Sequence, residues 1–262
     1  MRQQISVLAL VVTCVACGGG EADVTVTAVM EGADGVNLDE PWVVTFDQWL
    51  STIDEIQLSD DRGRVVAGNG DTNIALDYVQ ADDPVEVVSF VSPTGTYDFN
   101  FGVEVPDRNS ARITQRVEDT TLVLMERNTW THIISGTAVG PAPAGQKLPV
   151  KFFEWTFDAL SRNLACGDGV DVRGSGGEAE ITMLAESLFW LSLAEADPAT
   201  GFEHLALADQ DEDGEITEEE LRAAGVGAVD PDGEANNLYG YLRAALGRSV
   251  RLGPDGACDV RM

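Results

Sequence analysis

Apolar and polar residues alternate along the first part of the chain in a pattern typical of β-strands. Between residues 24 and 28, and again between 42 and 46, apolar side chains occupy every second position. A period of two places these side chains on one face of a strand, so each segment is expected to bury that face. The further strand candidates are residues 53–58, 74–78, 85–90, 97–105, 112–117, 121–125, 131–138 and 150–157.

Turns rich in proline and glycine separate these segments, notably at residues 93–95 and 141–145. Many short strands at this spacing are typical of an antiparallel β-sandwich. Apolar residues make up 44% of the chain, which is ample material for one core. The first part of the chain is therefore predicted to fold as such a sandwich.

The pattern changes from about Gly176 onward. Four apolar residues fit one face of a helix: Ile181, Leu184, Leu188 and Leu191. The first of them could instead finish a strand, because the spacing at that end fits both structures. Residues 235–246 predict another helix, which ends at Gly247.

Between these two helical segments, residues 209–220 read Asp-Gln-Asp-Glu-Asp-Gly-Glu-Ile-Thr-Glu-Glu-Glu. This spacing predicts a calcium-binding EF-hand loop, which needs side-chain oxygens at its first, third and fifth positions and a glycine at its sixth. The seventh position supplies a carbonyl, the ninth acts through a water, and the twelfth supplies a carboxylate. The expected ligands are Asp209, Asp211, Asp213, Glu215, Thr217 and Glu220.

An acidic, solvated loop that caps a helix is the alternative interpretation of this segment. It accounts for the charge, but not for Gly214, Ile216 and Glu220 in the register of a calcium loop. Hard oxygen ligands at this spacing suit Ca²⁺ better than Mg²⁺, which demands a tighter octahedron. EF-hands normally pair, so this single loop is expected to pack against the sandwich or the final helix.

The first residues predict export. A short basic start is followed by an apolar run at residues 5–12, which is too short to span a bilayer and is typical of a secretory signal. The run ends in a small residue, Cys17 and three glycines, which resembles the lipobox of bacterial lipoproteins. The resemblance implies lipidation at Cys17 and, because glycine follows it, anchoring in the outer membrane, facing the periplasm or the cell surface. The alternative is an ordinary signal peptide cleaved nearby.

Four cysteines occur in the chain, and two of them, Cys14 and Cys17, belong to the signal region. Cys166 and Cys258 remain, and an even pair in an exported protein is expected to form a disulfide. Two buried free thiols are the alternative. The chain therefore divides into a signal peptide and lipobox (1–17), a glycine-rich tether (18–22), a β-sandwich (23–175) and a helical EF-hand subdomain with a disulfide-tethered tail (176–262). This is an α+β fold class.

The formal net charge of −29 limits the partners. Phosphate binding needs clustered lysine and arginine, so nucleic acid is excluded, and anionic lipid surfaces are disfavoured. Any attachment to the membrane must then come from the lipid at Cys17. The calcium ion is the predicted cofactor, and an unidentified protein or glycan is the remaining possible partner.

No catalytic motif stands out in the sequence. Serine-hydrolase elbows, zinc-protease helices and phosphate-binding glycine loops are all missing. His132 lies in an apolar strand, where a core or edge position is expected, and His204 is expected to face solvent. Exposed tryptophans on the sandwich could form a glycan-binding face, with a core position as the alternative; the candidates are Trp42, Trp49, Trp130 and Trp155.

Two further segments carry a resemblance. Residues 93–98, Pro-Thr-Gly-Thr-Tyr-Asp, resemble transthyretin-like β-sandwich domains of bacterial lipoproteins. Ser187-Leu188-Phe189, the calcium loop, Asn236-Asn237-Leu238 and a terminal cysteine together resemble exported EF-hand lipoproteins of Gram-negative bacteria. The expected function is a non-enzymatic, calcium-binding exported lipoprotein in which calcium has a structural role. A calcium-dependent surface module that binds glycan or protein is the alternative.

Overall fold

The computed structural model of the chain is mostly β-sheet with a few short helices. It describes residues 20–32, 36–37, 42–70, 72–80, 84–107, 109–112, 117–142, 146–159, 161–189, 201–226, 235–247, 249–252 and 256–260. The predicted signal peptide with Cys14 and Cys17 lies outside these residues. No helix in the described ranges combines the length and the apolar composition of a bilayer crossing.

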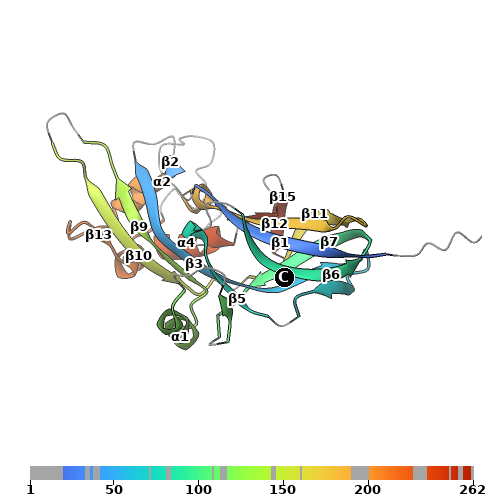
Figure 1. Cartoon of the computed structure of the whole chain (residues 1–262). Helices are drawn as coiled ribbons and strands as arrows, with labels where there is room; N and C mark the ends of the chain where they lie inside the picture. The colour runs from blue at the N-terminus through green and yellow to red at the C-terminus, as the bar shows by residue number, and fades with distance from the viewer. Residues whose placement is uncertain are drawn as a thin grey trace, which may run out of the picture.

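The strands and helices follow the chain in an order that Figure 1 traces from blue to red. The strands are β1 (Glu21–Glu31), β2 (Val36–Asn37), β3 (Val43–Ser59), β4 (Val65–Gly68), β5 (Ile74–Asp77), β6 (Val85–Pro93), β7 (Gly95–Val103), β8 (Ala111–Arg112), β9 (His132–Val139), β10 (Val150–Phe157), β11 (Ser161–Val172), β12 (Gly177–Leu184), β13 (Glu215–Ile216), β14 (Val250–Leu252) and β15 (Gly256–Val260). The helices are η1 (Tyr78–Gln80), α1 (Asp119–Asn128), η2 (Ala185–Leu188), α2 (Gly201–Ala206), α3 (Glu218–Ala223) and α4 (Leu238–Leu246).

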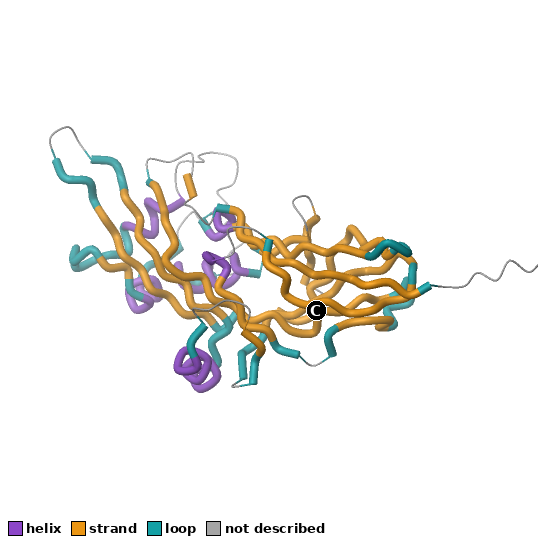
Figure 2. Tube along the Cα trace, viewed as in Figure 1, coloured by secondary structure: helices purple, strands orange, loops and turns teal. Residues whose placement is uncertain are grey.

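Eleven of the described strands follow one path through the sheet in the order β13-β10-β9-β3-β7-β11-β15-β14-β12-β1-β6. Off this path, β2, β4 and β5 pair with β3, and β8 pairs with β5. The long strand β3 joins the two parts of the sheet, since it pairs with β9 through residues 43–51 and with β7 through residues 53–59. Strands β1, β6 and β12 fold over β7 and β11, which makes two layers around the core (Figure 2). The sheet is mixed and not purely antiparallel, because β1 and β12 run parallel over eight residue pairs.

The predicted alternation is confirmed where one face of a strand is buried. In β1 every second residue from Ala22 to Met30 is buried, and β10 begins and ends at the predicted residues. The core joins both layers and reaches the helices that follow them. Its largest fully buried side chains include Trp49, Trp155, Phe99 and Phe101.

The prediction of a strand at residues 121–125 is wrong, because these residues lie in helix α1. Leu122 and Met125 are one helical turn apart and are buried against Leu50 and Ile133, whereas the intervening Val123 and Leu124 are about half exposed. The apolar run is therefore divided between a core face and a solvent face with helical spacing. Asp119 in the first turn and Arg127 in the last turn interact favourably with the helix dipole and stabilise the helix.

The segment after Gly176 begins with a strand, as the alternative for Ile181 and Leu184 allowed. Both residues lie in β12, and Leu188 lies in the short helix η2. Leu191 lies outside the described residues. The helix predicted at residues 235–246 is confirmed as α4, which begins after Asn237. The Asn237 side chain accepts a hydrogen bond from the Gly240 N–H, as expected of an N-cap.

His132 is buried within the sheet, which confirms the core position as its environment. It lies on β9 between β3 and β10, and Thr131 Oγ1 is 2.9 Å from its Nδ1. Burial lowers the pKa of His132 to about 3, so the ring is neutral at pH 7. The half-buried His204 lies on α2, beside the acidic loop that follows it.

Candidate metal centre

Residues 209–220, called the acidic loop below, connect α2 to α3 and lie against the edge strand β10 (Figure 1). Phe202 and Leu205 of α2 and Leu221 of α3 are fully buried in the core. The ring of Phe202 packs 5.2 Å from Trp42 and 5.7 Å from Phe189, measured between ring centroids. Apolar contacts on both sides thus fix the two ends of the loop.

The backbone of the acidic loop turns twice through the left-handed region. Glu212 has φ of 60° and Gly214 has φ of 92°, a conformation that favours glycine. The Asp211 carboxylate accepts a hydrogen bond from the Asp213 N–H at 3.2 Å, and the Asp213 carboxylate accepts one from the Glu215 N–H at 2.7 Å. These turns direct alternate side chains to the inside of the loop.

Three of the predicted ligands are brought together by this path. One carboxylate oxygen from each of Asp209, Asp211 and Asp213 lies within 4.8 Å of the other two. Ligand oxygens lie about 2.3–2.6 Å from Ca²⁺, so two of them on opposite sides of one ion are roughly 4.6–5.2 Å apart. The three carboxylates are therefore close enough to share a single calcium ion.

Asp209 supplies the strongest indication that a cation belongs in the loop. Its side chain is fully buried, and its Oδ1 has no hydrogen-bond partner among the described residues. Its Oδ2 accepts hydrogen bonds from the Gly214 N–H, at 3.0 Å, and from Lys151 Nζ. A buried carboxylate oxygen without a partner is costly, and a cation would satisfy it.

Asp209 is nevertheless charged. Burial acts to raise the pKa of Asp209, but the hydrogen bonds from Lys151 and Gly214 outweigh it and hold the pKa below its ordinary value. The loop consequently presents an ionised carboxylate at its most enclosed position. Asp211 and Asp213 are exposed to solvent.

Glu220, predicted as the closing ligand, does not join this cluster. Its Oε2 accepts hydrogen bonds from the N–H and the hydroxyl of Thr217, both at 2.9 Å, and its Oε1 accepts one from the Gln210 N–H at 3.0 Å. Thr217 Oγ1 in turn accepts the Glu220 N–H, which completes a capping box at the start of α3. Burial acts to raise the pKa of Glu220, but the Thr217 and Gln210 donors outweigh it and lower the pKa. Glu220 thus ties the second residue of the loop to its last turn.

Strand β10 pairs with the acidic loop through its backbone. Phe152 and Phe153 pair in parallel with Glu215 and Ile216 of β13. The Phe152 N–H donates to the Gly214 carbonyl at 2.8 Å, and Trp155 Nε1 donates to the Ile216 carbonyl at 2.8 Å. The expectation that the loop packs on the sheet is therefore confirmed.

A second set of contacts holds α3 to β10 and α4. The Glu218 carboxylate accepts hydrogen bonds from the N–H of Thr156, at 2.8 Å, and from its hydroxyl. The Tyr239 hydroxyl of α4 donates to the Thr156 carbonyl at 2.9 Å, and the Arg222 guanidinium lies 3.4 Å above the Tyr239 ring. Arg222 also pairs with Glu218. Helices α3 and α4 thus share one attachment point on the strand.

Lys151 and Glu218 are the contributors to this site that sequence analysis missed. Lys151 lies on the face of β10 that also carries Phe153 and Trp155, where the alternation calls for an apolar residue. A lysine at a core-facing position was the available signal, because such a side chain needs an acidic partner. Its partner, Asp209, lies 58 residues away in the sequence.

The other predicted functional residues lie elsewhere. Trp42, Trp49 and Trp155 are buried, which agrees with the core position for these three rings, and Trp130 is half-buried against the cluster that contains Leu122 and Met125 of α1. Their large apolar rings are more stable when buried in the core than when exposed to water. Cys166 lies opposite Cys258 in the antiparallel pair of β11 and β15.

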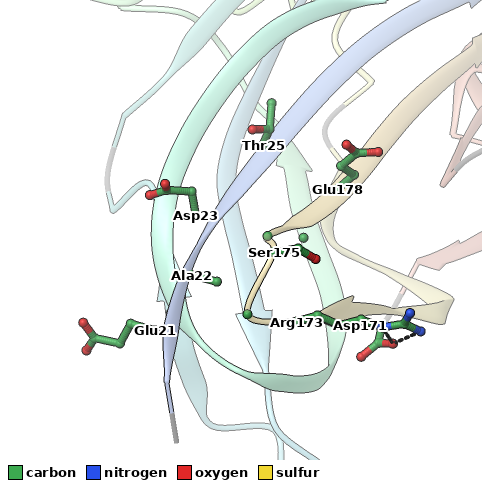
Figure 3. A pocket seen from close by; sticks show the side chains of 11 residues that line it. Glu21, Ala22, Asp23, Thr25, Asp171, Arg173, Ser175 and Glu178 are labelled. Atoms are coloured by element: carbon green, nitrogen blue, oxygen red, sulfur yellow. Dashed lines mark hydrogen bonds and ion pairs between the residues drawn. The ribbon is translucent and has the colours of Figure 1, made fainter.

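A separate hollow lies at the opposite end of the molecule, beside the start of β1 (Figure 3). It has a volume of about 670 Å³, and Glu21, Asp23 and Glu178 are among its lining residues. Its Arg173 is exposed and pairs with Asp171 at 2.7 Å. Exposed carboxylates around an open hollow do not by themselves define a binding site.

No family model, curated protein or solved structure matches the chain. The function is therefore inferred from the residues and geometry of the acidic loop.

Replacing Glu218 by glutamine should weaken the attachment of α3 to the sheet. The neutral amide keeps the shape but removes charge-assisted hydrogen bonds to Thr156 and the ion pair with Arg222, so the free energy of unfolding should fall by roughly 1–2 kcal/mol. Urea unfolding in the presence of a chelator measures this loss. Glu219→Gln is the matched control, because Glu219 is exposed in the same helical turn and its replacement changes the charge equally. Equal losses in the two variants would contradict the assigned contact.

Proposed function

We propose that the chain is a calcium-binding exported lipoprotein, with the acidic loop as an EF-hand site. The convergence of Asp209, Asp211 and Asp213, with one buried oxygen of Asp209 left without a partner, is the observation that supports this proposal. The residues that would hold the ion are Asp209, Asp211, Asp213, Glu215 through its carbonyl, Thr217 through a water, and Glu220. Calcium would neutralise carboxylates that otherwise repel one another.

Calcium has a structural role in this proposal. The loop is attached to β10 by backbone pairing, by the Trp155 indole and by Glu218, so the ion completes an assembly that already has a fixed place. A calcium sensor exposes a methionine-rich groove when it opens, and this chain has five methionines in total, one of them Met1. We also propose that the protein is non-enzymatic, because its sequence carries none of the catalytic motifs considered above.

The membrane attachment is the second part of the proposal. Lipidation at Cys17 would place an anchor four residues before β1, a distance of at most about 14 Å when extended. β1 begins at the end of the molecule far from the acidic loop (Figure 1). The lipid would therefore hold the chain at the outer membrane with the calcium site directed away from the bilayer, towards the periplasm or the cell surface.

A calcium-dependent module for binding protein is the second candidate, and one observation favours it. Four apolar side chains near the loop are exposed by 39–58%: Val43, Leu148, Val150 and Phe152. Val43 and Val150 both lie opposite Val139, so they are close together on the outer face of the sheet. Phe152 also donates its N–H to Gly214 of the loop, which connects this face to the calcium site.

A disulfide between Cys166 and Cys258 is the third part of the proposal. Cys166 is buried, and Cys258 is the residue directly opposite it in the β11–β15 pair. Residues directly opposite in an antiparallel pair have Cα atoms roughly 4.5–5.5 Å apart, which is within the range of disulfides. The bond would tie the last described strand to the sheet.

Calcium should raise the melting temperature of the mature protein, that is, the chain after processing by the cell. Free calcium at about 100 times its Kd stabilises the folded state by roughly 2.7 kcal/mol, if the unfolded chain does not bind. Glu220→Gln should largely remove this shift because it removes the closing carboxylate, whereas Glu219→Gln should retain it. Calorimetric melting curves in calcium and in chelator test the proposal, and identical curves for the unaltered chain would refute it.

Lipidation should depend on Cys17. Cys17→Ser is expected to abolish labelling by a fatty-acid probe in the expressing bacterium, while Cys14→Ser leaves labelling nearly intact, because a small residue precedes Cys17 and glycines follow it. Labelling that is lost with Cys14 instead would move the anchor to residue 14. If neither the unaltered chain nor the variants were labelled, the protein would be secreted without a lipid anchor.

Thiol counting should find no free cysteine in the processed, denatured protein until a reductant is added. Lipidation blocks the Cys17 thiol, and cleavage of the signal peptide removes Cys14, so reduction should expose two thiols. Mass spectrometry of the unreduced peptides should then show the segment around Cys166 linked to the segment around Cys258. Two accessible thiols without reductant would disprove the disulfide.

A further inference from the structure

Lys151 occupies an unusual position for a lysine. It lies on the core-facing side of β10, its side chain is 17% exposed, and its ammonium group pairs with Asp209, whose side chain is fully buried. Its neighbours on the strand, Val150 and Phe152, are exposed on the opposite face. Strand β10 thus places a positive charge beside Asp209, the first carboxylate of the acidic loop.

This charge acts where a metal ion would act. Asp209 stands at the first ligand position of the loop, and one of its oxygens is committed to Lys151 and the Gly214 N–H while the other has no partner in the described structure. Of the described basic residues, Lys151 is the one that forms an ion pair with a member of the aspartate cluster, namely Asp209. Lys151 therefore offsets part of the repulsion among these carboxylates without any bound metal.

We propose that Lys151 is an internal competitor of calcium, and that its ammonium group and the ion exchange at Asp209. The inference rests on the calcium-binding function proposed above. A calcium ion bonded to an Asp209 oxygen would lie within a few ångströms of the ammonium group, and two like charges at that distance repel strongly in a partly buried site. Calcium must therefore displace Lys151, whose four-carbon side chain is flexible enough to withdraw.

Two consequences follow for the loop. Without calcium, Lys151 stabilises the folded loop by neutralising Asp209, so the site is held in shape. With calcium, the same side chain lowers the affinity, because the ion pair must be broken first. Lys151 thus sets the calcium concentration at which the site fills, and it does so from a strand outside the loop.

Replacing Lys151 by glutamine separates these two effects. In the mature full-length chain, Lys151→Gln should bind calcium at least about tenfold more tightly than the unaltered chain. Its melting temperature in chelator should be lower than that of the unaltered chain. Lys151→Arg should keep the weaker binding because it keeps the charge. Lys147→Gln is the matched control: Lys147 is exposed four residues earlier, and its replacement changes the net charge equally without touching Asp209.

Titration calorimetry with calcium chloride, together with melting curves in chelator, distinguishes the outcomes. Tighter binding by Lys151→Gln alone supports the proposal, and so does binding that appears in this variant but is undetectable in the unaltered chain. Unchanged or weaker binding by Lys151→Gln overturns it, because Lys151 would then only support or position Asp209, and the calcium function would stand. Failure of the unaltered chain and of every variant to bind millimolar calcium would overturn the calcium function itself.

Discussion

The parallel pairing of β13 with β10 is the interaction on which the arrangement of the candidate site depends. A helix–loop–helix of this size buries little apolar surface by itself, and its loop carries eight acidic side chains. Strand β10 compensates for both weaknesses, because Phe152 and Phe153 supply backbone partners and Lys151 supplies a positive charge. The Trp155 indole and Thr156 then fix the end of the loop and the start of α3. One strand of eight residues therefore supplies the backbone partners, a positive charge and the side-chain contacts that hold the acidic loop in place.

The success of the strand predictions depended on how each segment is buried. Residues 150–157 were placed correctly because β10 alternates between core and solvent, and only a strand has that period. The prediction for residues 121–125 was wrong because its run of four apolar residues, 122–125, fits a strand or a helix equally well. The helical conformation depends on tertiary contacts, because Leu122 and Met125 pack with Leu50 and Ile133 in a cluster that only the folded sheet creates. Tertiary packing decided the conformation, as it often does for short apolar runs.

The candidate site divides in the same way into a local and a distant part. The spacing of Asp209, Asp211 and Asp213 and the turn at Gly214 are local, so twelve residues of sequence contain the ligand pattern. Lys151 and Trp155 come from 58 and 61 residues away, and no local pattern connects them to the loop. The capping box between Thr217 and Glu220 agrees with the alternative interpretation of this segment as a loop that caps a helix. Glu220 can either cap α3 or close a metal site, and the sequence is the same for both.

Attachment to a sheet also bears on what calcium can do in this chain. In a pair of loops, each loop can move relative to the other, since neither belongs to a larger sheet. Here the partner of β13 is β10, whose other edge is paired along all eight residues with β9, and β9 is paired in turn with β3. Moving β10 would break register across three strands and disturb the packing of Phe153 and Trp155, which are buried in the main core. Under the proposed function, a change on calcium binding would therefore be confined to the parts not paired with the sheet, namely Asp209 to Asp213, the Glu220 carboxylate and the Lys151 side chain. The fold thus favours a calcium ion that completes a fixed site over one that moves a domain.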